Sequence, residues 1–156
     1  MRWVGEPEDL MSTPFRQLLK DPRVIELLSM IGTPYWWGRG TPKTSWPAEY
    51  YDCSGFAQGA LVYLNLLRPT EPDRGAYALA NESDRVTDEP KLGDLAFYDK
   101  PVSHVMVCLN KDWVIGATGG GSHTLGDDAN ACVKLVPLRY RKDLLVVGRL
   151  KKDLAP

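Results

Sequence analysis

The stretch YYDCSGFAQGALVYLNLL, residues 50–67, predicts an amphipathic helix whose first turn carries a cysteine. Asp52 is a preferred N-cap residue, because its carboxylate accepts a hydrogen bond from an unpaired N–H group of the first turn. Arg68-Pro69 ends the helix, since the residue before a proline disfavours helical backbone. Apolar side chains recur on one face of this segment at Phe56, Ala60, Tyr63, Leu64 and Leu67. We therefore expect a helix packed on a core, with Cys53 at its start.

Shorter patterns on either side of this stretch complete the predicted fold. Thr13-Pro14 and Asp21-Pro22 each place an N-cap residue before a proline at the first helical position, so two helices are expected before Gly32. YALANESDR is at most a short helix, and after Lys91 the apolar period becomes two residues, which is typical of strands. The expected strands are DLAFYD, SHVMVCLN, DWVIGAT, ACVKLVPL and LLVVGRL. Helices followed by strands indicate an α+β fold, with N-terminal helices packed on a five- to six-stranded, mainly antiparallel sheet.

Length and charge narrow the function classes. A chain of 156 residues fits one domain over 1–156, with residues 1–31 as a helical extension. The net charge of −1 gives no reason to expect nucleic acid or an anionic membrane as a partner. No apolar run approaches the ~20 residues of a membrane span. The start, MRWVGEPEDLMSTPF, lacks an apolar segment and a cleavage site, so no secretory signal is expected.

The cysteines and histidines are too few for a disulfide scaffold or a metal site. There are three cysteines, Cys53, Cys108 and Cys132, and two histidines. An odd, sparse set does not form a disulfide framework, although a single Cys108–Cys132 bridge stays open as an alternative. Without a C-x-x-C motif a structural zinc has almost no ligands, so we expect neither a metal nor a cofactor.

Cys53 and His104 are the candidate reactive pair. A thiol is a nucleophile only as its thiolate, with an ordinary pKa near ~8.5, and a helix N-terminus favours the negative charge. His104 begins the strand pattern HVMVCL, in which Val105, Val107 and Leu109 share one face and His104 lies on the other. Its imidazole would act as the base, and backbone N–H groups near the sulfur would bind an oxyanion. The plainer alternatives are a buried apolar cysteine and a structural histidine.

Several motifs in fixed order resemble one enzyme family. GTPYWWGRGTP, YDCSGF, KLGDLAFYD, SHVMVCLN, VIGATGG and VGRL, from Gly32 to Leu150, resemble the NlpC-type peptidases, papain-like cysteine hydrolases that cut peptidoglycan stem peptides. The resemblance implies a papain-like fold, with Cys53 as the nucleophile and His104 as the general base. It also implies that Tyr35 holds the oxyanion or the substrate.

The resemblance further implies that Asp52 and Ser54 help to bind the stem peptide, and Trp37 in YWW is a candidate for lining the substrate groove. Each of these residues also has a simpler reading. Asp52 is then only a helix cap and Ser54 a first-turn residue. Tyr35 and Trp37 are then ordinary loop aromatics.

The chain departs from the family at the third catalytic position. The family pattern HVGIYLG…xIHA has a polar residue, often His, twelve residues after the base, and here that position is Gly116. A glycine has no side chain with which to orient an imidazole. Three replacements are open: the Gly116 carbonyl, Thr118, or His123 from the loop GGGSHT. We prefer His123, and the alternative is an exposed histidine without a role.

These patterns predict a cysteine hydrolase that cleaves a stem-peptide amide through a thioester. The resemblance points to the bond between D-glutamate and the adjacent diamino acid. One alternative is a weak or inactive wall-binding module of a phage tail or secreted assembly, and another is an acyl or amide transferase. We expect synthesis in the cytoplasm and action in the cell wall or periplasm after delivery by a phage or a secretion machine, with cytoplasmic recycling of wall peptides as the alternative.

Overall fold

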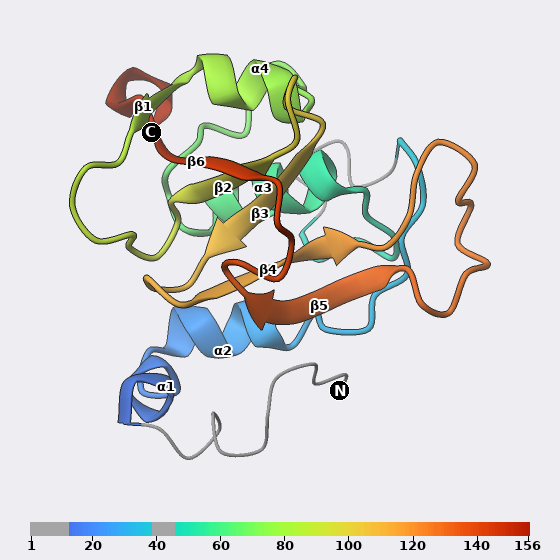
Figure 1. Ribbon diagram of the computed structural model, residues 1–156, viewed down its shortest axis with the longest axis horizontal. Coiled ribbons are helices and arrows are strands. Elements are labelled where there is room, and N and C mark those ends of the chain that lie inside the picture. The colour runs from blue at the N-terminus through green and yellow to red at the C-terminus, as the bar shows by residue number, and fades with distance from the viewer. Residues whose placement is uncertain (1–12, 39–45) are drawn as a thin grey trace.

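The computed structural model describes residues 13–38 and 46–156, in which helices come first and a six-stranded sheet follows (Figure 1). The helices are α1 (Thr13–Leu18), α2 (Pro22–Leu28), α3 (Cys53–Tyr63) and α4 (Ala76–Asn81). The strands are β1 (Ser83–Arg85), β2 (Leu95–Tyr98), β3 (His104–Cys108), β4 (Trp113–Thr118), β5 (Cys132–Pro137) and β6 (Leu144–Leu150). A short 3-10 helix, η2 (Lys152–Leu154), follows β6.

The strands form one sheet in the order β1-β6-β2-β3-β4-β5, and every pair in it is antiparallel. The predicted α+β class is therefore confirmed, with six strands. The five strands expected from the sequence all form. β1 was not expected, because its three residues, SDR, carry no apolar alternation; it pairs with β6 at the edge of the sheet.

The N-terminal helices begin where the sequence places them. The Asp21 carboxylate accepts a hydrogen bond from the Arg23 N–H at 2.9 Å, and Pro22 is the first residue of α2. Val24 and Leu27 of α2 are buried in the same apolar core as α3. In Figure 1, α1 and α2 lie at one end of the sheet, while α4 and β1 lie at the other. The opening segment, in which no secretory signal is expected, lies mostly outside the described residues, which start at 13.

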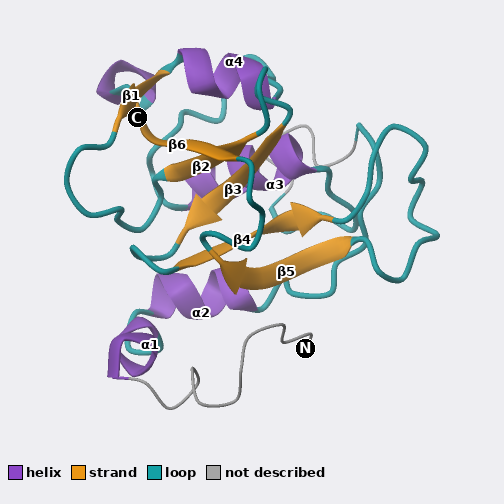
Figure 2. Ribbon diagram, viewed as in Figure 1, coloured by secondary structure: helices purple, strands orange, loops and turns teal. Residues whose placement is uncertain are grey.

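The sheet buries both of its faces. Val105, Val107 and Leu109 pack with α3 in the larger core, as the alternation predicted. Met106 and Cys108 lie in a second, smaller core on the opposite face. The connection between β5 and β6 runs across that second face (Figure 2), and its residues Leu138 and Tyr140 pack into the second core. Residues of this connection therefore come close to the start of β3, although they lie far from it in sequence.

The cysteines are all buried, and none of the three forms a disulfide in the described structure. The Cys108–Cys132 bridge, which the sequence left open, is therefore not made. No helix of the described residues has the length and apolar character required to cross a membrane.

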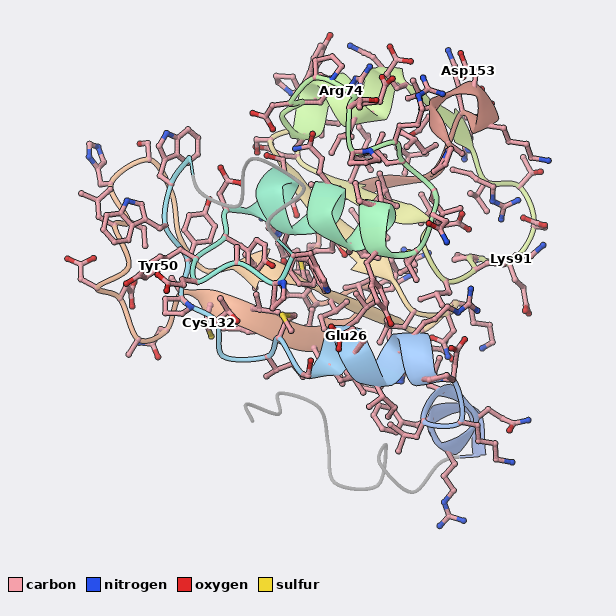
Figure 3. All side chains as sticks on the ribbon, turned by 180° about the vertical axis from the view of Figure 1, so that it is seen from behind. Glu26, Tyr50, Arg74, Lys91, Cys132 and Asp153 are labelled. Carbon is pink, nitrogen blue, oxygen red and sulfur yellow. The ribbon has the colours of Figure 1, made fainter. Side chains whose placement is uncertain are left out.

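Gln58 fastens the connection between α3 and α4 to the centre of the fold. It is fully buried in α3, and its Nε2 donates to Asp73 Oδ1 and to the Arg74 carbonyl, both at 2.8 Å. Its Oε1 accepts from the Arg74 N–H at 2.9 Å. Seen from behind, α3 lies across the sheet, and Arg74 lies on the segment that leads to α4 (Figure 3). A single buried amide thus satisfies the polar groups of a connection that has no regular structure of its own.

Replacing Gln58 should destabilise the fold. Gln58→Leu leaves the half-buried backbone N–H and carbonyl of Arg74 without their Gln58 partners, so we expect the free energy of unfolding to fall by about 1–3 kcal/mol in urea denaturation. Gln17→Leu, on the exposed surface of α1, is the control and should change it by less than about 0.5 kcal/mol. Equal unfolding midpoints for the two variants would contradict this role of Gln58.

Candidate active site

Asp52 fixes the position of Cys53. It is the N-cap of α3, as predicted, and its Oδ1 accepts a hydrogen bond from the Gly55 N–H at 2.7 Å. Its Oδ2 accepts from the Gly38 N–H at 3.0 Å. The Ser54 hydroxyl lies 3.4 Å from Oδ1. One carboxylate therefore caps the helix that carries Cys53 and also holds the segment that carries Tyr35.

The Cys53 thiol is buried and neutral in this structure. Only 8% of the residue is exposed, and this burial, together with the charge of Asp52, raises the pKa of the thiol to about 11. The backbone N–H groups of Val105 and Ser54 act in the opposite direction but do not prevail. The expected depression of the thiol pKa by the helix N-terminus is therefore wrong for this state, because desolvation outweighs the amide dipoles.

His104 begins β3 and is also buried, with 8% exposed. Its ring lies on the side of the second core, 5.6 Å from the ring of Tyr98, its cross-strand neighbour. Its Nε2 lies 2.8 Å from the Tyr140 hydroxyl. Burial and, to a smaller extent, the Arg141 charge lower the pKa of His104 to about 4, with Asp143 partly opposing them. The imidazole is therefore neutral at pH 7.

The fold brings the two candidate groups to the same end of the sheet. The Val105 N–H, which lies near enough to the Cys53 sulfur to lower the pKa of the thiol, belongs to the residue directly after His104. Within the described residues, no hydrogen bond joins the sulfur directly to the His104 ring, whose bonded nitrogen is Nε2. The resting state is thus a neutral thiol and a neutral imidazole. The other ring nitrogen, Nδ1, is the one left for a reacting group.

Tyr35 lies beside Cys53, as the sequence motifs implied. Burial raises the pKa of its hydroxyl, and the nearby Cys53 and Asp52 raise it further. A protonated phenol at this position can donate a hydrogen bond. The connection between β4 and β5 passes over the ring so closely that a side chain at Gly120 would lie 2.5 Å from it. This close packing limits the movement of the Tyr35 ring.

Trp37 lies at the rim of the site. Trp37 is 52% exposed, and its backbone N–H donates to the Thr124 carbonyl at 2.8 Å. The neighbouring residue Trp36 pairs with Leu125, which is also 52% exposed. The side chains of Trp37 and Leu125 are therefore exposed to solvent beside the segment that contains Tyr35. Residues 39–45, which follow this segment, lie outside the described residues.

The residue that contacts the second ring nitrogen of His104 is one that the sequence analysis did not propose. His123 is exposed, and no hydrogen bond in the described structure joins it to His104, so the preferred replacement is not brought to the site. Tyr140 lies at His104 Nε2 instead, and Thr118 lies 2.9 Å from the same hydroxyl. Thr118 was among the open alternatives. Tyr140 was not, because it comes from the connection after β5, 36 residues away from His104, and no local pattern signals it.

The Met106 side chain fills the space that a side chain at position 116 would need. A Cβ atom at Gly116 would lie 2.7 Å from the Met106 sulfur, on the neighbouring strand. The family pattern HVGIYLG…xIHA has the small residue at the position of Met106 and the large one at the position of Gly116. This chain thus has the large and small residues exchanged between β3 and β4. Neither β4 position 116 nor His123 can orient His104 here.

The described residues contain no group of three or more His, Cys, Asp or Glu side chains that could hold a metal ion. The chemistry available at the site is that of a thiol, an imidazole, a phenol and backbone amides. Such a set suits nucleophilic attack on an acyl group.

Comparison with known proteins agrees with this arrangement. The model of the NlpC/P60 family matches residues 32–133. The peptidoglycan hydrolase RipB from Mycobacterium tuberculosis has a similar fold, with a TM-score of 0.59 and 23% identity over 95% of this chain and 74% of RipB. The NlpC/p60 domain of the peptidoglycan hydrolase SagA gives 0.54 and 25% over 81% of this chain and 94% of that domain. These similarities confirm the expected papain-like fold.

A further similar structure is NlpC1 from Trichomonas vaginalis, with a TM-score of 0.57 and 19% identity. The match covers 83% of this chain but only 42% of NlpC1, so this chain spans less than half the length of that relative. A search of curated protein sequences finds no match.

The thiol environment predicts slow alkylation of the resting protein. A pKa of about 11 instead of 9.0 leaves about a hundredfold less thiolate at pH 7.5, so Cys53 should react with iodoacetamide about a hundredfold more slowly than a free thiol. Peptide mass mapping separates Cys53 from the two other cysteines. The urea-unfolded protein is the control and should react at the ordinary rate. Faster alkylation of Cys53 in the folded protein than in the unfolded one would contradict the neutral thiol.

Proposed function

We propose that this chain, which belongs to the NlpC/P60 family, is a cysteine hydrolase that cleaves an amide bond in peptidoglycan stem peptides. RipB and SagA, with which it shares its fold, are peptidoglycan hydrolases. The observation that carries the proposal is the position of the Cys53 sulfur. It lies at the capped start of α3, against the amide next to His104 and beside the Tyr35 hydroxyl.

The reaction begins from the neutral pair. His104 removes the thiol proton as the sulfur attacks the carbonyl carbon, so a C–S bond forms and the carbonyl oxygen becomes an oxyanion. The C–N bond then breaks, and the proton passes from His104 to the leaving amine. Water, deprotonated by His104, releases the acyl group from the thioester. Catalytic hydrogen bonds are frequently long in unliganded enzymes, so the sulfur and Nδ1 need approach only when substrate is bound.

Tyr35 and backbone amides would stabilise the oxyanion. The raised pKa of Tyr35 keeps its hydroxyl protonated, so it can donate to the developing negative charge. Burial strengthens this interaction, because the local dielectric constant is lower than that of water.

The substrate contacts are also proposals. Ser54 and Asp52 flank the nucleophile, and Trp37 offers an exposed ring at the rim. Both oxygens of Asp52 already accept backbone N–H groups, which supports its capping role beside any contact with substrate. We propose the D-glutamyl–diamino acid bond as the one cleaved. Delivery to the cell wall by a phage particle or a secretion machine stays a prediction from the sequence.

A second candidate is a wall-binding module with weak or absent catalysis. The observations that favour it are the 8% exposure of Cys53 and the high pKa of its thiol. A module of this kind would retain the fold and the exposed rim side chains while releasing no fragments. The two candidates therefore differ in a single measurable quantity, the release of stem-peptide fragments.

Loss of the sulfur nucleophile should abolish fragment release. We expect Cys53→Ala to lower the rate by at least about 1,000-fold, because no other group of the site can form the thioester. Mass spectrometry of digested sacculi measures the rate and identifies the bond. Cys108→Ala removes a buried thiol from the second core and is the control, with a rate close to wild type. Equal release by wild type and Cys53→Ala would eliminate the hydrolase and favour the wall-binding module.

The acid limit of activity should lie unusually low. The base must be neutral, and since the pKa of His104 is lowered to about 4, kcat/KM should stay constant down to about pH 5 and fall below it. The same shift makes the fold lose stability as the pH falls from about 6.5 through 4, because the unfolded chain binds the proton first. Circular dichroism at each pH separates the two effects. An acid limb centred near pH 6.5, with the fold intact, would contradict the assignment.

A further inference from the structure

Three hydroxyl and imidazole groups form a continuous hydrogen-bonded chain behind the candidate active site. His104 Nε2 lies 2.8 Å from Tyr140 Oη, which lies 2.9 Å from Thr118 Oγ1. The three residues come from β3, from the connection between β5 and β6, and from β4. The chain is part of the second core, on the side of the sheet opposite α3. It therefore holds the imidazole from the side away from α3.

Packing fixes the Tyr140 ring in this position. The ring of Tyr98 lies 5.4 Å from that of Tyr140, edge to face, and contacts the His104 ring as well. The Tyr98 hydroxyl is occupied elsewhere, because it donates to the Leu138 carbonyl at 2.8 Å. His104 and Thr118 are both buried, so little water competes for the Tyr140 hydroxyl. In such surroundings a single hydrogen bond determines which way the imidazole faces.

The number of protons on His104 and Tyr140 determines which group donates in each hydrogen bond. An imidazole nitrogen can take a proton only if it carries none, and Nε2 is already engaged with Tyr140. Nδ1 is then the basic atom if Nε2–H donates to the Tyr140 oxygen. A phenol oxygen can accept one hydrogen bond while it donates its own proton in another. The single phenol proton of Tyr140 is therefore left for Thr118 Oγ1, and every group in the chain is satisfied.

We propose that Tyr140, supported by Thr118, is the positioning residue of His104: its oxygen accepts Nε2–H and so keeps Nδ1 unprotonated for the Cys53 thiol. This inference rests on the proposed hydrolase function. The Tyr140 phenol, from the connection after β5, thus orients the imidazole, a role that the family pattern gives to the side chain at position 116. Position 116 is closed to such a side chain by the Met106 sulfur.

Removal of one oxygen atom tests the proposal. Tyr140→Phe keeps the ring packing but loses the hydrogen bond, so kcat on soluble muropeptides should fall about tenfold or more, with KM nearly unchanged. Thr118→Val should give a smaller fall in kcat. Tyr98→Phe is the matched control: it removes a buried phenol oxygen from the same aromatic cluster, but one that bonds a backbone carbonyl. It should leave kcat within about twofold of wild type.

Nitrogen-15 NMR of the imidazole provides a readout that a structural role would not change. The chain has only two histidines, so a His123→Gln background isolates the signals of His104. We expect the Nε2–H tautomer in this background, and a shift toward Nδ1–H or a mixture when Tyr140→Phe is added. Tyr98→Phe should leave the tautomer unchanged.

The two measurements separate this inference from the proposed function. A tenfold fall in kcat together with the tautomer shift supports the positioning role. An unchanged tautomer in Tyr140→Phe overturns it, whether kcat falls or not, because any loss is then structural. If the wild-type protein releases no fragments, the hydrolase proposal fails, and the tautomer shift alone still decides whether Tyr140 sets the protonation of His104.

Discussion

The two hydrogen bonds of the Asp52 carboxylate are the constraint on which the site depends. One oxygen caps α3 at Gly55, and the other holds Gly38, at the end of the segment that begins with Tyr35. Without the cap, the first turn would not direct the sulfur at the amide of β3. The second bond adds to the backbone pairing of Tyr35 with Tyr51, which also holds this segment near the start of α3. Burial of α3 against the sheet then carries this local arrangement into the centre of the fold.

Desolvation decides the protonation of the resting pair. The pKa values of Cys53 and His104 are about 11 and about 4, a separation of about 7, which corresponds to about 10 kcal/mol for moving the proton between isolated groups. Attraction within an ion pair at ~4 Å returns roughly 4 kcal/mol at an effective dielectric constant of ~20. The neutral thiol and neutral imidazole are therefore more stable than the ion pair in the resting protein. Thiolate formation is then coupled to attack on the substrate, where Tyr35 and the amides can share the negative charge.

Local patterns predicted what depends on neighbours in sequence. The cap at Asp52, the two faces of β3 and the antiparallel strands all follow from spacing and residue type, and all are present. The polar edge strand β1 is set by its pairing with β6, which no spacing reveals. The thiol pKa was predicted in the wrong direction, because the burial that raises it arises from the whole fold. Tyr140 reaches His104 only because the connection after β5 covers the second face of the sheet.

The exchange of large and small residues between β3 and β4 makes Met106 and Gly116 interdependent. A histidine introduced at 116 alone would collide with the thioether, and a glycine introduced at 106 alone would open a void beside the Tyr98 cluster. Neither substitution is accommodated without the other, so the two sites are epistatic. An evolving chain could exchange Tyr140 for a histidine at position 116 only by changing residues on both β3 and β4. The need for two simultaneous changes separates the two ways of orienting His104.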